Sequence, residues 1–162
     1  MTLLLGTGMR VSECVGINIK DLDFQNNAVK VTRKGGNEVF LYFGEEVRET
    51  LADYLEERQN ALTKDENEDA LFLSSQGKRI GVRTVQNMVK KYAQLVTPLK
   101  KITPHKLRST YGTNLYRETG DIYLVADVLG HSDVNTTKKH YAALEDERRR
   151  SARNKVQLRE IE

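Results

Sequence analysis

The sequence has a single cysteine, Cys14, and no long run of apolar residues. One thiol excludes an internal disulfide and, without a Cys/His zinc spacing beside it, favours the reducing cytoplasm. The absence of an apolar run predicts no membrane-spanning helix. The opening "MTLLLG" is too short for a signal peptide, and no basic region precedes it. We therefore expect a cytoplasmic protein that does not associate with a membrane.

The composition is that of an ordinary globular chain. Apolar residues make up 38% and charged residues 30% of the 162 positions, which suits one soluble domain with a real core. The net charge of +3 favours an anionic partner only slightly, because many unrelated proteins have a similar balance. No internal repeat or low-complexity tract occurs.

A three-stranded antiparallel sheet is expected near the start of the chain. Val29 and Val31 alternate with polar residues, which is the period of a half-buried strand. The pairs Asn26-Asn27 and Gly35-Gly36 tolerate positive φ and therefore mark two hairpin turns. Lys34 then lies at the tip of the second hairpin.

The remaining sequence predicts helices, so the expected fold class is mainly α with a small antiparallel sheet (α+β). The opening "MTLLLGTGMR" is expected to be the end of a helix, and Ser12 to cap a short helix through "ECVGI". Thr103 followed by Pro104 is a strong helix start. Apolar spacing and capping residues predict helices over residues 45–62, 82–96 and 104–119, between Asp121 and Gly130, and over 132–139.

One of these helices carries a pair of donors. His105 and Arg108 stand three residues apart and share a helix face. An imidazole beside a guanidinium suits phosphate oxygens, of which an arginine binds two in a fork. The alternative is a surface helix with scattered basic residues.

Two further cations lie near glycine turns. Arg10 follows "TGM" at a helix start, where backbone N–H groups favour anions, and Glu13 is placed to hold it from behind. Lys34 on a mobile hairpin is suited to donating a proton into a cleft. The alternatives are a modest surface ion pair for Arg10 and an exposed turn lysine for Lys34.

Tyr141 completes the set of candidates. A phenol has a pKa of roughly 10 and needs nearby cations to act as a nucleophile. Seven tyrosines occur, and most are expected to be packing residues. The candidate set has no carboxylate cluster for two metal ions, and no phosphate-binding glycine loop is present. A cationic site without metal or cofactor indicates phosphoryl transfer through a covalent phosphotyrosine; its six members are Arg10, Lys34, His105, Arg108, His131 and Tyr141.

Four segments then occur in a specific order: "TGMRVSE", "RKGGNE", "PHKLRSTYGTNL" and "LGHSDVNTTKKHYA". Together they resemble the catalytic domain of the tyrosine recombinases, the phage integrase and Xer-like family. The gaps of 24 residues from Arg10 to Lys34 and 23 from Arg108 to His131 agree with that family. The resemblance implies the recombinase catalytic fold and site-specific DNA cleavage and rejoining through a 3′-phosphotyrosyl intermediate, in integration or recombination serving a mobile element.

The resemblance also implies a phosphate clamp. Arg10 and Arg108 match the two arginines that hold the scissile phosphate. His105 matches a histidine that binds the phosphate and assists proton transfer. His131 matches a position that hydrogen-bonds a phosphate oxygen.

The remaining roles follow in the same way. Tyr141 matches the nucleophile, Lys34 the lysine that protonates the departing 5′-hydroxyl, and Glu13 an acidic residue that supports Arg10. One residue more than is usual in the family separates His131 from Tyr141. We expect it to be absorbed in the turn before the tyrosine.

Double-stranded DNA is the implied partner, with self-association into a tetrameric synapse. We expect a catalytic domain over residues 1–144, without the family's N-terminal DNA-binding domain, and a docking tail over 145–162 anchored by Val156, Leu158 and Ile161. The lysines expected to face DNA, each alternatively a solvated surface residue, are Lys90, Lys91, Lys100, Lys101, Lys106, Lys138 and Lys139.

Two other functions remain open at this stage. A type IB topoisomerase-like enzyme performs the same cleavage but rejoins the same strand. A non-catalytic, basic DNA-binding module uses the helix from Pro104 for backbone contacts alone. The third alternative is a structural domain whose four motif matches are accidental.

Overall fold

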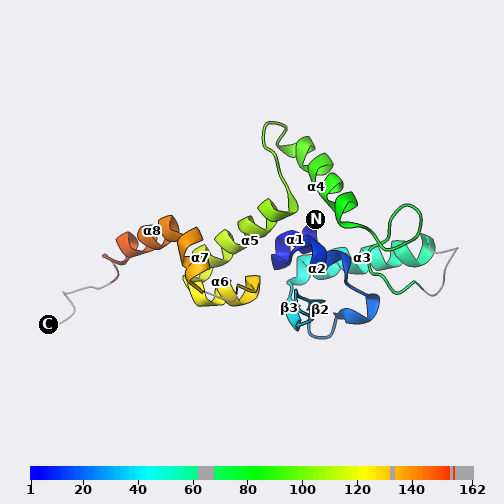
Figure 1. Ribbon diagram of the computed structural model, residues 1–162, viewed down its shortest axis with the longest axis horizontal. Helices are drawn as coiled ribbons and strands as arrows, with labels where there is room; N and C mark the ends of the chain where they lie inside the picture. The colour runs from blue at the N-terminus through cyan, green and yellow to red at the C-terminus, as the bar shows by residue number, and fades with distance from the viewer. Residues whose placement is uncertain (62–67, 132–133, 154, 156–162) are drawn as a thin grey trace. The chain divides into compact units, whose positions relative to one another are not determined.

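The structure, a computed structural model, describes residues 1–61, 68–131, 134–153 and 155. The chain divides into two compact units, Met1–Tyr111 and Gly112–Glu162 (Figure 1). The expected boundary after residue 144 falls inside the helix α8, Ala142–Ala152.

The first unit contains the predicted sheet. Its strands β1, β2 and β3 pair antiparallel in chain order, which confirms the expected three-stranded arrangement. Val29 pairs with Leu41 and Val31 with Val39, and both β2 valines are fully buried. The elements before and within the sheet are α1 (Thr2–Thr7), α2 (Val11–Val15), the 3-10 helix η1 (Ile19–Asp21), β1 (Leu22–Asp23), β2 (Ala28–Thr32) and β3 (Glu38–Tyr42).

Three longer helices follow the sheet: α3 (Glu45–Ala61), α4 (Val82–Val96) and α5 (Pro104–Thr119), of which the last begins in the first unit and ends in the second. α4 has its predicted bounds. α3 also begins as predicted, but Leu62 lies outside the described residues. At the start of α5 the Thr103 hydroxyl accepts a hydrogen bond from the Lys106 N–H at 3.2 Å, which confirms the predicted cap.

The core of the first unit joins the short helices to the sheet. Met9 and Ile17 from the α1–η1 region are buried with Val29, Val31 and Leu71. Cys14 is buried beside them, and burial raises the pKa of its thiol to about 11. The thiol is therefore neutral near pH 7 and packs as a small apolar group.

A buried arginine of α3, Arg58, binds the backbone of residues 68–71. Arg58 donates to the carbonyls of Glu68 at 2.8 Å and Ala70 at 2.6 Å, and its Nε lies 3.2 Å from the Leu71 carbonyl. Ala70 also forms an isolated bridge with Asn18. These three carbonyls do not belong to a regular strand pair, so the arginine supplies their hydrogen-bond donors.

The second unit is helical in its described part, with α6 (Ile122–Leu129), α7 (Val134–His140) and α8. The Asp121 carboxylate accepts from the N–H groups of Tyr123 and Leu124, and Gly130 ends α6 with φ 73°, both as predicted. The proposed tail anchors at residues 156, 158 and 161 lie outside the described residues. Among the described helices, none is long and apolar enough to cross a membrane.

Two local expectations are wrong. The N-cap of α2 is Arg10 and not Ser12, because Glu13 binds the Arg10 N–H and so starts the helix two residues earlier. Before Tyr141 the described chain is helical from Val134 through His140, and the turn lies at Tyr141 itself. The turn expected directly before Tyr141 is therefore not present in residues 134–140, and residues 132 and 133 lie outside the described residues.

Replacing Arg58 with methionine should lower the free energy of unfolding by about 2–3 kcal/mol, because the side chain keeps its bulk but leaves buried carbonyls unpaired. Urea titration followed by circular dichroism measures the change. Arg83→Met on the exposed side of α4 is the matched control and should stay within about 0.5 kcal/mol of the parent. Equal stability of the two variants would contradict this role for Arg58.

Candidate active site

The site in the first unit is built on a glycine turn. Gly8 ends α1 in the left-handed conformation, with φ 69°, and its N–H donates to the Leu4 carbonyl at 3.0 Å. This turn places Arg10 in an extended conformation directly before α2, with φ −74° and ψ 152°. The sequence "TGMR" therefore fixes the backbone of the arginine at a helix N-terminus, where the helix dipole favours anions.

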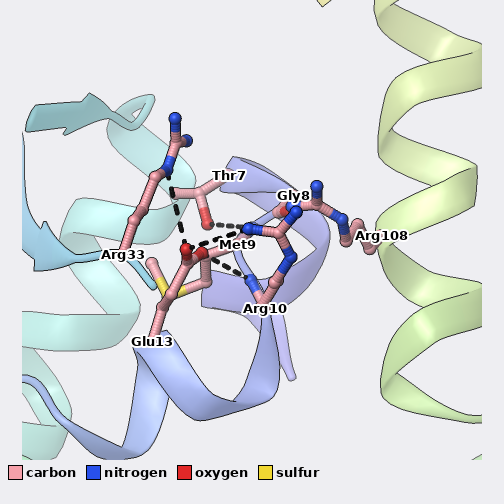
Figure 2. A network of polar contacts seen from close by, with 7 residues as sticks. All are labelled: Thr7, Gly8, Met9, Arg10, Glu13, Arg33 and Arg108. Atoms are coloured by element: carbon pink, nitrogen blue, oxygen red, sulfur yellow. Dashed lines mark hydrogen bonds and ion pairs between the residues drawn. The ribbon is translucent and has the colours of Figure 1, made fainter. Parts of the chain in front are cut away.

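Glu13 lies buried behind Arg10, as predicted. Its Oε1 accepts from the Arg10 N–H at 2.8 Å, and its Oε2 is 3.6 Å from the Arg10 Nη1. Figure 2 shows a second cation on the same oxygen, Arg33, whose Nε is also 3.6 Å away. The Glu13 side chain is 3% exposed, whereas the Arg10 side chain is 41% exposed. The carboxylate thus holds Arg10 at its base and leaves part of the arginine open to solvent.

Arg108 comes to the same turn from α5, a hundred residues later. Its Nη1 donates to the Gly8 carbonyl at 2.7 Å, in a buried position (Figure 2). Tyr111, one helical turn on, packs its ring against Gly8, where a side chain would meet the ring at 2.3 Å. Burial raises the pKa of Tyr111, which keeps its phenol neutral. Arg10 and Arg108 therefore both lie at the Gly8 turn (Figure 2).

His105 and Lys34 are both exposed. His105 stands in the first turn of α5, three residues before Arg108, which places the two on one side of the helix. Lys34 stands in the turn between β2 and β3, followed by two glycines with φ of 91° and 86°. The predicted hairpin tip is confirmed.

His131 belongs to the second unit and is held by α7. Its N–H donates to the Ala126 carbonyl at 2.9 Å, directly after the glycine that ends α6. Its ring Nδ1 contacts the Oγ1 of Thr137 at 2.5 Å, and Thr137 is fully buried. The Thr137 carbonyl in turn accepts from the Tyr141 N–H at 3.0 Å. One threonine therefore links the two predicted site residues of this unit.

Tyr141 is buried within its own unit, with 4% of its surface exposed. Its ring stacks on Tyr116 at 6.1 Å between centroids and meets the edge of His140 at 4.8 Å. Its hydroxyl lies over Gly112, where an added Cβ would come within 2.1 Å of the oxygen. The structure thus places the candidate nucleophile in a packed position.

Three residues of these networks were not predicted: Arg33, Gly112 and Thr137. The inward position of Arg33 could have been predicted from the sequence, because strand alternation puts it on the same side of the hairpin as the buried Val29 and Val31. No comparable signal indicates Gly112 or Thr137, since their importance depends on where Tyr141 and His131 fold.

The lysines predicted to face DNA are mostly exposed. Lys138 is the exception, half-buried with its Nζ 5.2 Å from the Tyr123 ring centre. Lys90, Lys100 and Lys101 gather with Gln94 and Leu99 around a cavity of about 360 Å³ at the end of α4. In the part of the chain that the structure describes, no group of three or more His, Cys, Asp or Glu residues is arranged to hold a metal ion.

Comparison with known proteins shows the family of the chain. Residues 1–148 match the model of the phage integrase family. The chain belongs to that family, the tyrosine recombinases. It is 37% identical over 141 residues to tyrosine recombinase XerC of Thermodesulfovibrio yellowstonii and 34% identical over 138 residues to XerD of Staphylococcus epidermidis. Each alignment covers 85% of this chain and 47% of the relative, so the chain spans about half the length of these relatives.

Solved structures confirm the fold class. The crystal structure of XerA recombinase matches with a TM-score of 0.77 and 33% identity, over 85% of this chain and 49% of that one. The Tn1549 transposon integrase in complex with transposon right end DNA matches with a TM-score of 0.74 and 25% identity, over 95% and 57%. The mainly helical fold with a three-stranded sheet is therefore that of a tyrosine recombinase catalytic domain.

Gly112→Ala should destabilise the chain by about 1–3 kcal/mol, because the new methyl overlaps the Tyr141 hydroxyl. In a Tyr141→Phe background that oxygen is absent, so the same change should cost less, with a coupling energy of about 1–2 kcal/mol in the double-mutant cycle. Urea unfolding measures all four proteins.

Gly44→Ala is the control for this cycle, since its Cβ would meet nothing within 4 Å. It should show no coupling to Tyr141→Phe. Additive free energies for Gly112→Ala and Tyr141→Phe would refute the packed position of the tyrosine.

Proposed function

We propose that this chain is the catalytic part of a site-specific DNA recombinase that cleaves and rejoins DNA through a 3′-phosphotyrosyl intermediate. The observation that carries the proposal is the pairing of Arg10 and Arg108 at the Gly8 turn, in a chain that belongs to the tyrosine recombinases. Two guanidinium groups fixed at one backbone turn form the kind of preorganised cationic clamp that phosphoryl transfer requires.

In the proposed reaction, Tyr141 Oη forms a bond to the scissile phosphorus and the bond from phosphorus to the 5′-oxygen breaks. His105 assists removal of the phenolic proton, and the Lys34 ammonium gives a proton to the departing 5′-oxygen. Arg10, Arg108 and His131 stabilise the phosphoryl oxygens as charge develops on them. A 5′-hydroxyl from another strand then attacks the phosphotyrosine and releases the enzyme, which exchanges the strands.

Double-stranded DNA is the proposed partner, with a tetramer of protomers on two sites and with no metal or cofactor. Two relatives of known structure support DNA as the partner: XerH bound to its difH substrate, at 25% identity, and the Tn1549 transposon integrase bound to transposon DNA. We propose the cytoplasm as the compartment. Glu13 supports Arg10 in this scheme, and the exposed lysines near α4 and α5 contact DNA phosphates.

Tyr141→Phe should abolish covalent capture, because the attacking oxygen is removed. The substrate is a library of nicked duplexes with random sequence, from which the wild-type chain selects its own site, and the adduct is seen on a denaturing gel. Tyr123→Phe removes an exposed phenol from the same unit and should leave the adduct intact. An adduct that persists in Tyr141→Phe would refute the assignment. Transfer of the captured strand to a second duplex separates a recombinase from a topoisomerase-like enzyme.

Changing Lys100 and Lys101 together to glutamine should weaken DNA binding about equally for all sequences. It should also reduce the salt slope by about 1 for each phosphate that is no longer neutralised. Fluorescence anisotropy over a range of salt concentrations measures both effects. The charge-matched control changes the exposed Lys20 and Lys78 to glutamine. If both double variants behave alike, the lysines at the end of α4 do not contact DNA.

A further inference from the structure

Arg33 occupies the position at which the hairpin carrying Lys34 closes. Its N–H donates to the Asn37 carbonyl at 2.7 Å, and its carbonyl accepts from the Gly36 N–H at 3.0 Å. Lys34 and Gly35 are the two central residues of the turn so formed, and the positive φ of Gly35 meets the requirement of a type II turn. The backbone of Arg33 therefore closes the turn that presents the exposed Lys34.

The side chain of Arg33 points away from that turn and into the unit. It is 13% exposed, and its Nε lies 3.6 Å from Glu13 Oε2 (Figure 2). Arg10 meets the same oxygen at the same distance but with a side chain that is 41% exposed. Both contacts are ion pairs at 3.6 Å and not hydrogen bonds, and water screens the Arg33 pair less because its side chain is more buried.

Glu13 thereby joins two segments that carry different parts of the proposed chemistry. Through its Oε1 it fixes the backbone of Arg10 at the start of α2. Through Oε2 it fixes the base of the hairpin that ends in Lys34. The tip of this hairpin has few restraints of its own. Gly35 and Gly36 both have positive φ, and a Cβ added to either would meet no atom within 4 Å. Contacts at the base of the hairpin must therefore hold the tip in place.

We infer that Arg33 is a positioning residue, which holds the Lys34 turn in register with Arg10 through the shared Glu13 carboxylate. This rests on the proposed function, in which Lys34 is the general acid toward the departing 5′-oxygen. The ammonium loses one proton, the 5′-oxygen gains it, and the phosphorus keeps Tyr141 in place of that oxygen. Arg33 touches none of the reacting atoms in this scheme, and acts by limiting where the lysine can be.

The first test needs no catalysis. Hydrogen exchange of the backbone amides at position 33 and at Gly36 reports closure of the hairpin, and both should lose protection in Arg33→Gln. Lys30→Gln is the matched control, because Lys30 lies on the same hairpin and pairs instead with Asp21 and Glu38. Unchanged protection of these two amides in Arg33→Gln would overturn the inference, whatever the activity of the chain.

The second test isolates the protonation step. Two nicked duplexes of the sequence selected by the wild-type chain differ in one atom, a bridging oxygen or sulfur at the scissile 5′ position. A thiolate departs without a proton, so the sulfur substrate does not require Lys34. The Arg33→Gln variant should cleave the oxygen substrate about ten- to a hundredfold more slowly than the wild type, which is part of the rate that a positioned acid contributes. It should cleave the sulfur substrate close to the wild-type rate.

Reference variants make the outcome specific. Lys34→Ala should show the same pattern with a larger loss, Arg33→Lys should recover part of the rate, and Lys30→Gln should cleave both substrates normally. If Arg33→Gln slows both substrates equally, Arg33 acts on folding or on Arg10 and the inference is wrong. It is also wrong if only DNA binding weakens, since Arg33 would then contact phosphate. If the wild-type chain forms no adduct at all, the proposed function fails, while hydrogen exchange still tests the tether.

Discussion

The burial of one carboxylate, Glu13, organises the first unit. A charge that is 3% exposed must be compensated by partners, because the protein interior solvates it poorly. The partners are the Arg10 N–H and the guanidinium groups of Arg10 and Arg33. They come from two segments of the proposed phosphoryl-transfer site, so neutralising one acid also connects the start of α2 to the hairpin.

Gly8 is the second constraint, and its effect is steric and not electrostatic. Its left-handed φ ends α1, and the ring of Tyr111 occupies the volume that a side chain would need. With no side chain there, α5 approaches closely enough for Arg108 to reach the Gly8 carbonyl. Any larger residue would both strain the turn and push α5 away, so the arginine pair depends on a residue that contributes no functional group.

Local signals in the sequence predicted much of this arrangement. The pairs Asn26-Asn27 and Gly35-Gly36 located the two hairpin turns, because they tolerate positive φ. Three residues, Thr103, Asp121 and Gly130, located helix ends through hydrogen bonds or dihedral angles within a few residues. The prediction for Ser12 was wrong for a reason that is also local. Serine is a good N-cap, but the hydrogen bond from the Arg10 N–H to Glu13 starts α2 two residues earlier. The family motifs supplied the site residues, and the Gly8 contact brings two of them together.

What could not be predicted depends on tertiary packing. The role of Gly112 appears only once the Tyr141 hydroxyl is known to lie over it, and that of Thr137 once His131 folds back onto α7. Nothing within a few residues of either position indicates these contacts. Arg33 could be predicted in part. The alternation of side chains along β2 indicates that Arg33 faces the same side of the hairpin as Val29 and Val31, but not that it pairs with Glu13.

The packed state of Tyr141 adds a requirement to the proposed chemistry. A phosphate of duplex DNA cannot enter a packed interior, so the ring must leave its stack on Tyr116 before its oxygen can attack. Losing the packing of a buried aromatic side chain costs several kcal/mol in general, about 3–5 kcal/mol when the ring is removed outright. DNA contacts must offset part of that cost. In the proposed reaction, Arg10 and Arg108 stabilise the transition state, whereas the packing of Tyr141 against Tyr116 and His140 limits how often its oxygen is free to attack.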